Sequence, residues 1–223
     1  EETQKRGLNR AEHRLHLRCE LPHHTTLPLF EKLVDREPVS LVSLMDHSPG
    51  QRQFARIEKY REYYQGKYAL TNEEMARYEE EQRQLAAQWS QPNRLSIAAM
   101  CRDRNIALAS HDDATHEHVR ESHQLGSVIA EFPTTFEAAE ASRTHGMNVL
   151  MGAPNIVRGG SHSGNVAASA LASLGLLDIL SSDYYPASLL DAAFRVAADE
   201  NNRFTLPQAI RLVTKNPATA LNL

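Results

Sequence analysis

The stretch Asn105–Thr115, NIALASHDDAT, runs from five mostly apolar residues directly into a histidine and two aspartates. A short apolar run of this kind is typical of a strand that is buried on both faces, as in a parallel sheet. His111, Asp112 and Asp113 therefore stand where the strand ends, and Thr115 beyond them is a helix-capping residue. The stretch predicts a strand–helix unit with reactive side chains at the carboxyl end of its strand.

Further apolar stretches of strand length alternate with helical patterns along the rest of the chain. This alternation predicts repeated βα units, and so an α/β fold with a parallel sheet. The predicted strands are Arg14–Leu21, Pro38–His47, Ile106–Asp112, Ser127–Pro133, Asn148–Pro154 and Leu177–Asp183. One predicted helix begins after Thr71, which has Glu74 in capping-box spacing, and another covers Arg94–Asn105.

Composition limits the classes of function. The chain has 223 residues, of which 41% are hydrophobic and 23% are charged, as in a globular domain with its own core. A net charge of -4 gives no reason to expect a nucleic acid or an anionic membrane as partner. No apolar run is long enough to cross a bilayer. Cys19 and Cys101 suggest no disulfide framework and fit a reducing, cytoplasmic location.

Residues that can bind metal ions stand at the ends of several predicted strands: Glu20, His47, His111 and Asp183. α/β barrels place their reactive groups at the carboxyl ends of their strands. Imidazole together with carboxylate is the ligand set that suits zinc and similar divalent ions. A single histidine at a strand end is more often a hydrogen-bonded structural residue, whereas several such residues at equivalent positions favour a shared metal site.

The segment Met151–Asn165, MGAPNIVRGGSHSGN, combines glycines with hydrogen-bond donors and leads into a helical pattern. Backbone amides at a helix N-terminus beside an arginine make a natural anion site. A glycine-rich connector with incidental polar residues is the alternative interpretation. The candidate substrate-binding residues of this segment are Asn155, Arg158, Ser161, His162, Ser163 and Asn165.

These motifs together resemble the amidohydrolase superfamily of metal-dependent hydrolases. In that family two histidines and an aspartate end barrel strands, and they match His47 in LMDHSPG, His111 in ASHDDAT and Asp183 in SSDYYPAS. Glu20 in HLRCEL matches a strand-end position that often bridges two metals, with His16 as the weaker choice. The resemblance implies a (β/α)8 TIM barrel that holds one or two divalent metal ions, expected to be zinc.

Four longer stretches are similar to a narrower branch of that superfamily, the triphosphate diphosphatases of the carbon–phosphorus lyase pathway. They are SHDDATHEHV, AEFPTTFEAA, MGAPNIVRGGSHSGN and ILSSDYYPASLLDAAF. This resemblance implies hydrolysis of the triphosphate chain of a small phosphorylated ribose phosphonate, with release of pyrophosphate. The alternatives are an amidohydrolase that acts on a cyclic amide or imine, and a non-catalytic fragment whose histidines are structural.

The resemblance also implies roles for individual carboxylates. Asp183 is expected to be a metal ligand or the base that accepts a proton from water. Asp112 is expected to orient His111 from behind, and Asp113 to cap the helix that begins near Thr115. Glu131 either faces the pocket or is a buried structural carboxylate.

The sequence departs from the family pattern at its beginning, because it contains neither the HxH motif of the first barrel strand nor the usual small β-domain. Residues 1–223 are therefore expected to be the C-terminal part of a barrel domain, from about its fourth strand to its eighth. An incomplete barrel exposes strand edges and apolar surface. Association into a homo-oligomer is expected for this reason.

Overall fold

Six parallel strands form the sheet of this chain, whose computed structural model describes residues 2–36, 38–161 and 164–223. The strands are β1 (Leu15–Glu20), β2 (Val39–Met45), β3 (Ala107–His111), β4 (Ile129–Glu131), β5 (Asn148–Gly152) and β6 (Ile179–Ser181). They lie in chain order, and each strand is parallel to its neighbours. The predicted strands are confirmed, although each is shorter than the apolar stretch that predicted it.

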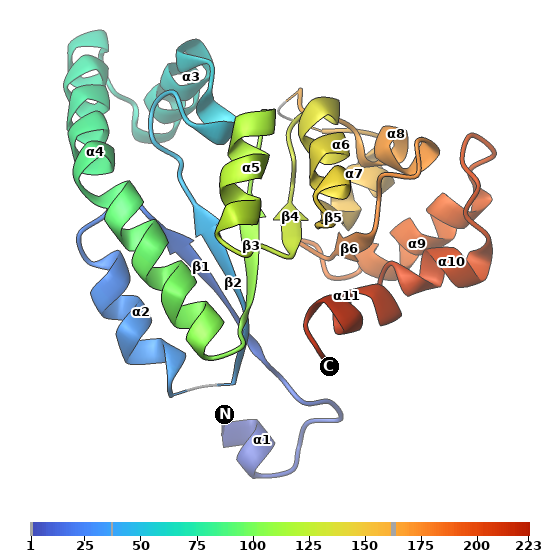
Figure 1. The fold of residues 1–223 in the computed structure, drawn as a ribbon. Helices are drawn as coiled ribbons and strands as arrows, with labels where there is room; N and C mark the ends of the chain where they lie inside the picture. Colours follow the sequence, from blue (N-terminus) through green and yellow to red (C-terminus); the bar gives the residue numbers. More distant parts are fainter. Residues whose placement is uncertain (1, 37, 162–163) are drawn as a thin grey trace.

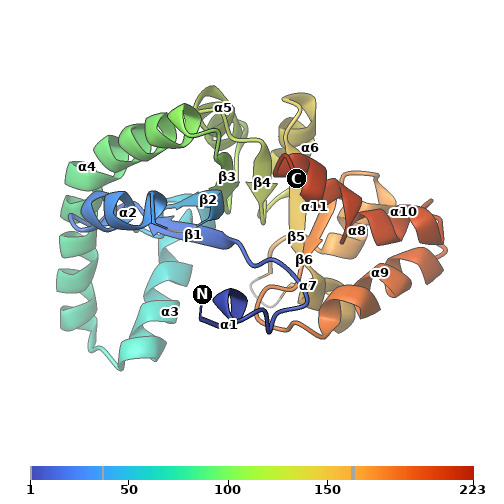
Figure 2. The same cartoon turned by 90° about the horizontal axis from the view of Figure 1, so that it is seen from below.

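Helices connect the strands and cover the outer face of the curved sheet, as Figure 2 shows for α2, α4, α5 and α6. Connections between adjacent parallel strands are right-handed, so they place successive helices on the same face. The helices are α1 (Glu2–Lys5), α2 (Thr26–Val34), the 3-10 helix η1 (Arg52–Phe54), α3 (Ile57–Tyr68), α4 (Asn72–Asp103), α5 (His116–Gln124), α6 (Phe136–Thr144), α7 (Ala153–Arg158), α8 (Ala168–Ser173), α9 (Ser188–Ala198), α10 (Leu206–Arg211) and α11 (Lys215–Ala220). None of the helices that the structure describes combines the length and the apolar character that crossing a membrane requires.

The hydrophobic core lies mainly between the outer face of the sheet and these helices. Over the first three strands, Val42 and Leu108 pack with Phe30 of α2 and Ile97 of α4. Each fully buried side chain of this size stabilises the fold by about 1.5–3 kcal/mol. The inner face carries a smaller apolar cluster, against which Leu221, just after α11, packs. The chain therefore covers part of its own inner face.

The predicted eight-stranded TIM barrel is wrong for this chain. Within the described ranges β1 pairs only with β2 and β6 only with β5, so the sheet is open at both edges. A barrel closes only when strand number, tilt and stagger fit together. Six strands arranged in chain order leave the first and last strands apart. The open sheet is compatible with part of a barrel.

A single long helix, α4, replaces the two helices that the sequence predicts between Thr71 and Asn105. The predicted capping box is confirmed, because the Thr71 hydroxyl accepts a hydrogen bond from the Glu74 amide and the Glu74 carboxylate accepts one from the Thr71 amide. Pro92 lies inside the helix, which bends partway along its length (Figure 1). An internal proline removes one backbone hydrogen bond and bends a helix without necessarily ending it.

The connection between β2 and β3 is unusually long, and its residues 52–90 are called here the helical insertion. It consists of η1, α3 and the first half of α4, which project beyond the carboxyl ends of the neighbouring strands (Figure 1). A small core of its own, formed around Phe54, Tyr60 and Met75, holds these elements together. The insertion therefore stands at the edge of the sheet where the predicted site lies.

Candidate metal and phosphate site

Two histidines and an aspartate converge at the carboxyl ends of β2 and β3. Potential ligand atoms of His47, His111 and Asp112 all lie within 4.8 Å of one another. The Asp112 Oδ2 atom is 3.5 Å from His47 Nε2 and 3.4 Å from His111 Nε2. We call this the His–His–Asp group. Its donor atoms and spacing suit a divalent metal ion.

Each histidine of the group is hydrogen-bonded through its Nδ1 atom to a carboxylate. His47 Nδ1 lies 2.6 Å from Glu20 Oε2, and His111 Nδ1 lies 2.7 Å from Glu131 Oε2. An ionised carboxylate only accepts hydrogen bonds, so each Nδ1 carries the proton that it donates. In both rings Nε2 lies near Asp112, and the neutral ring, which is the form that binds a metal ion, has no proton on Nε2. Carboxylate–histidine pairs of this kind orient metal-binding imidazoles.

Burial and the neighbouring charges shift several pKa values at this edge. Burial opposes the charged form of His47, but the hydrogen bonds from its ring to Asp112 and Glu20 raise its pKa to about 9. Burial likewise opposes the charge of Glu131, yet the hydrogen bond from His111 holds its pKa below the ordinary value. Burial raises the pKa of Asp183, and the nearby negative charges of Glu131 and Asp112 add to the effect. The raised pKa means that the Asp183 carboxylate has an increased affinity for a proton.

Three residues that follow strands have left-handed backbone conformations. Asp112 after β3, Phe132 after β4 and Asp183 after β6 have φ values of 57°, 57° and 48°. Such conformations cost roughly 1–3 kcal/mol each and cluster at functional sites. Aspartate tolerates this region better than phenylalanine does. All three residues line one cavity, so the candidate site includes three of the seven described non-glycine residues with positive φ.

That cavity, of about 180 Å³, joins the His–His–Asp group to the glycine-rich segment. Asp112 and Asp183 line it together with four of the predicted substrate-binding residues, Asn155, Arg158, Ser161 and Asn165. His162 and Ser163 lie outside the described residues. Arg158 Nη1 donates a hydrogen bond to the Tyr184 hydroxyl at 3.1 Å. The cavity is thus lined both by carboxylates, Asp112 and Asp183, and by cationic or amide groups.

The two predicted carboxylate ligands, Glu20 and Asp183, have different surroundings in the structure. Both oxygens of Glu20 bond to His47, one to its ring and one to its amide, so Glu20 lies outside the His–His–Asp group. Asp183 lines the cavity, and its Oδ2 lies 3.3 Å from the position that a Cβ atom on Gly152 would occupy. Glycine at position 152 therefore leaves room for the Asp183 carboxylate. Asp112, predicted to support His111, is itself a member of the group.

Two other sequence predictions concern residues beside the group. His16, the weaker alternative to Glu20, has Nε2 at 2.6 Å from the Ser43 hydroxyl. The prediction that Asp113 caps α5 is wrong, because Thr115 caps it by accepting a hydrogen bond from the His118 amide. Asp113 is buried and forms an ion pair with Arg52. A buried carboxylate needs such a counter-charge, and here the tertiary fold provides it.

Sequence reasoning missed Arg18 and Gln53. Arg18 Nη2 lies 3.2 Å from His111 Nε2. The alternation of β1 was a usable signal, because it places Arg18 on the same face of the strand as Glu20. Gln53 of the helical insertion lines the same cavity as Arg158. No local pattern in the sequence indicates that the two line one cavity, because they are far apart in the chain.

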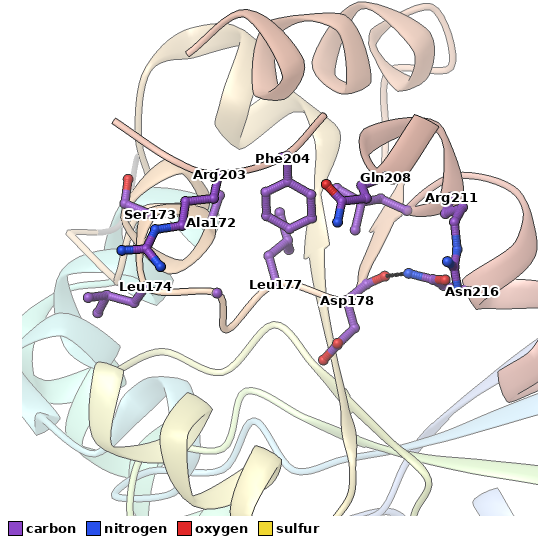
Figure 3. A pocket seen from close by; sticks show the side chains of 12 residues that line it. Ala172, Ser173, Leu174, Leu177, Asp178, Arg203, Phe204, Gln208, Arg211 and Asn216 are labelled. Atoms are coloured by element: carbon purple, nitrogen blue, oxygen red, sulfur yellow. Dashed lines mark hydrogen bonds between the residues drawn. The ribbon is translucent and has the colours of Figure 1, made fainter. Parts of the chain in front are cut away.

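A second cavity, of about 610 Å³, lies at the opposite end of β6 (Figure 3). Arg203 and Arg211 stand at opposite ends of it with Phe204 between them. Its carboxylate, Asp178, pairs with Arg143 and accepts a hydrogen bond from the backbone amide of Val149. Both contacts fix the position of the Asp178 side chain just before β6. None of the residues that line this cavity belongs to the His–His–Asp group.

Comparison with curated proteins identifies a very similar enzyme. The chain is 87% identical, over all 223 of its residues, to the alpha-D-ribose 1-methylphosphonate 5-triphosphate diphosphatase of Escherichia coli (strain K12). It spans 59% of the length of that relative. No protein-family model and no solved structure matches the chain. The resemblance to diphosphatases that the motifs indicated is confirmed by this identity.

Proposed function

We propose that this chain carries the metal site and the phosphate-binding segment of an enzyme that hydrolyses alpha-D-ribose 1-methylphosphonate 5-triphosphate and releases pyrophosphate. The observation that carries the proposal is a single cavity lined by both Asp112 of the His–His–Asp group and Arg158. The 87% identity to the E. coli diphosphatase supports the choice of substrate. Phosphoryl transfer needs this combination of a metal ion and fixed cationic donors.

A divalent ion fits the His–His–Asp group, and we propose that it is zinc. Two imidazoles, each with its Nδ1 proton bonded to a carboxylate, together with the Asp112 carboxylate form a common zinc ligand set. Asp183 is proposed as a further ligand or as the catalytic base. Glu20, predicted as a ligand, is better placed to orient His47. When bound, the ion supplies Lewis-acid polarisation of a phosphoryl oxygen and lowers the pKa of water.

The residues of the chain can then perform the rest of the reaction. Asp183 accepts a proton from the attacking water, because its raised pKa increases its affinity for that proton. Arg158 donates hydrogen bonds to phosphate oxygens and stabilises the negative charge that spreads over them. The water oxygen bonds to phosphorus while the bond between the first and second phosphates breaks. Pyrophosphate leaves, and one phosphate stays on the ribose.

We also propose a cytoplasmic homo-oligomer with neither nucleic-acid nor membrane partners. The net charge of -4 supports the absence of polyanionic partners. Cys19 and Cys101 are free and buried, as suits a reducing compartment. Within the described ranges the outer edges of β1 and β6 have no partner strand, which supports association through those edges.

The function can be tested in a chimera in which residues 1–223 replace the matching part of the E. coli diphosphatase, so that the remaining length is present. With the ribose triphosphate as substrate, the chimera is expected to release pyrophosphate. Removal of divalent metal by a chelator should abolish this release, and zinc should restore it. Successive release of single phosphates, or hydrolysis of a cyclic amide instead, would contradict the proposal.

Glu131→Gln is expected to weaken metal binding by the chimera about 10- to 100-fold, the usual effect of removing a carboxylate that orients a metal-binding histidine. The glutamine keeps the size of the side chain but removes the charge that holds His111 Nδ1–H. Zinc titration against a competing chelator measures the effect. Glu137→Gln is the matched control, because Glu137 is an exposed carboxylate that bonds to the His116 amide. Equal zinc affinities for the two variants would contradict the role of Glu131.

A further inference from the structure

We infer that Lys59, on helix α3 of the helical insertion, is a second cationic substrate-binding residue and that it faces the glycine-rich segment of Arg158. The inference rests on the proposed function and adds to it a contact from a distant part of the chain. It means that the insertion binds the phosphate chain as well as covering the strand ends.

The position of Lys59 is the first observation. Its Nζ atom lies 3.7 Å from the position that a Cβ atom on Gly164 would occupy. Gly164 belongs to the same glycine-rich segment as Arg158, Ser161 and Asn165, which line the cavity. The ammonium group of Lys59 therefore stands beside the predicted anion-binding segment, although the two are far apart in the sequence.

The beginning of the insertion lines the same cavity. Gln53 of η1 is among the lining residues together with Asn155 and Arg158. The ring of Phe54 lies edge-on to that of His47, with 6.2 Å between the ring centres. η1 thus contacts both the metal-binding side and the phosphate-binding side of the site. Lys59 lies on the next helix after this contact.

Buried ion pairs hold the start of the insertion in place. Arg52 has a left-handed φ of 43° and pairs with Asp113 and Glu121. Glu121 also pairs with Arg94 of α4. Because these partners come from the end of β3, from α5 and from α4, the backbone that precedes Gln53 is fixed relative to the strand ends.

A cluster of aromatic rings fixes α3 against α4. Tyr60, the residue after Lys59, is almost fully buried at 1% exposure. Its ring centre lies 4.5 Å from that of Tyr64, which in turn lies 5.5 Å from that of Tyr78 on α4. A helix that is held in this way keeps Lys59 beside Gly164. Less conformational entropy is therefore lost when substrate binding orders this part of the chain.

The negative charge at this edge favours a further cation beside the phosphate chain. Asp112 and Asp183 line the cavity itself, and a triphosphate would meet their negative charges. Arg18 lies beside His111, and Arg158 lies on the glycine-rich segment. Hydrogen bonds from charged donors to phosphate are among the stronger polar contacts. Lys59, beside Gly164 of the same segment, would help to offset this repulsion.

The test compares Lys59→Met, Lys59→Arg and Lys67→Met in the chimera. Lys67 lies on the same helix but over the rings of Tyr63, Tyr64 and Tyr68, so its substitution removes the same charge away from the site. Lys59→Met is expected to raise KM about 10- to 100-fold with kcat nearly unchanged, because a charge-assisted contact is lost. Lys59→Arg should recover most of the loss, and Lys67→Met should match the unsubstituted chimera.

A binding measurement separates this inference from the proposed function. Calorimetric titration with inorganic tripolyphosphate should show weaker binding for Lys59→Met than for Lys67→Met, whether or not the chimera turns over the ribose substrate. An unsubstituted chimera that releases no pyrophosphate would contradict the proposed function alone. The role of Lys59 is overturned if Lys59→Met leaves both KM and tripolyphosphate affinity unchanged, or if Lys67→Met weakens them equally.

Discussion

His111→Ala in the chimera is expected to remove bound metal and to reduce pyrophosphate release by roughly 1000-fold or more. Lewis-acid stabilisation by a metal ion is worth several kilocalories per mole, and a loss of about 4 kcal/mol corresponds to a rate decrease of this size. His111 carries the largest effect because its ring also connects Glu131 to Asp112. Metal content by elemental mass spectrometry and initial rates of pyrophosphate release measure the two losses together.

The control for this prediction is His123→Ala. His123 lies on α5, where its ring is 4.8 Å from that of His145 between ring centres, and it is not part of the His–His–Asp group. This variant should keep the metal content and the rate of the unsubstituted chimera. Full metal content and an unaltered rate in His111→Ala would remove His111 from the site and would favour the interpretation of a structural histidine.

Arg52→Met is expected to lower the free energy of unfolding by about 3–5 kcal/mol, the effect of breaking a buried ion pair by removing one partner. Arg52 is 4% exposed, and Asp113 is 1% exposed. Burial lowers the pKa of Arg52 to about 10, and the positive charge of Arg94 adds to this, but the side chain stays protonated at neutral pH. The substitution leaves Asp113 buried without its counter-charge. Urea denaturation of the chain measures the change.

A matched substitution at the surface is the control for Arg52. Arg195→Met breaks the 2.9 Å contact with Asp191, an exposed pair one helical turn apart. Such pairs contribute about 0.3–0.5 kcal/mol. In addition, Arg52→Met combined with Asp113→Leu should recover part of the lost stability, because no unpaired carboxylate remains at that position. Equal losses in Arg52→Met and Arg195→Met, or no recovery in the double variant, would contradict the role of the buried pair.

The ion pairs of Arg52 and Arg94 lie next to the candidate metal site, so a substitution that destabilises the fold there should also disturb the site. Asp113 directly follows Asp112, and Asp46 directly precedes His47. Arg94 of α4 pairs with Asp46, while Arg52 pairs with Asp113. The backbone next to His47 is therefore anchored to α4, and the backbone next to Asp112 is anchored to the start of the helical insertion. Loss of Arg52 should disturb the site as well as the fold, whereas loss of Lys59 should affect only binding.

The sequence alone determined the local features of this protein. Apolar stretches predicted the strands, because a strand that is buried on both faces needs them. Strand ends placed His47, His111 and Asp183 at one edge, since parallel strands have their carboxyl ends on the same side. The capping box of Thr71 and Glu74 was also readable, because it depends on residues only three positions apart. The longer motifs indicated the resemblance to diphosphatases, to one of which the chain is 87% identical.

The tertiary structure decided which side chains meet across strands and helices. Strand register brings Glu20 to His47 and Glu131 to His111, so the carboxylates that orient the rings depend on pairings between distant segments. The ion pair of Arg52 with Asp113 also depends on distant segments, and it is why Asp113 does not cap α5 as predicted. Closure of the sheet is likewise a global property. It depends on the number of strands and their stagger, which no single stretch of sequence contains.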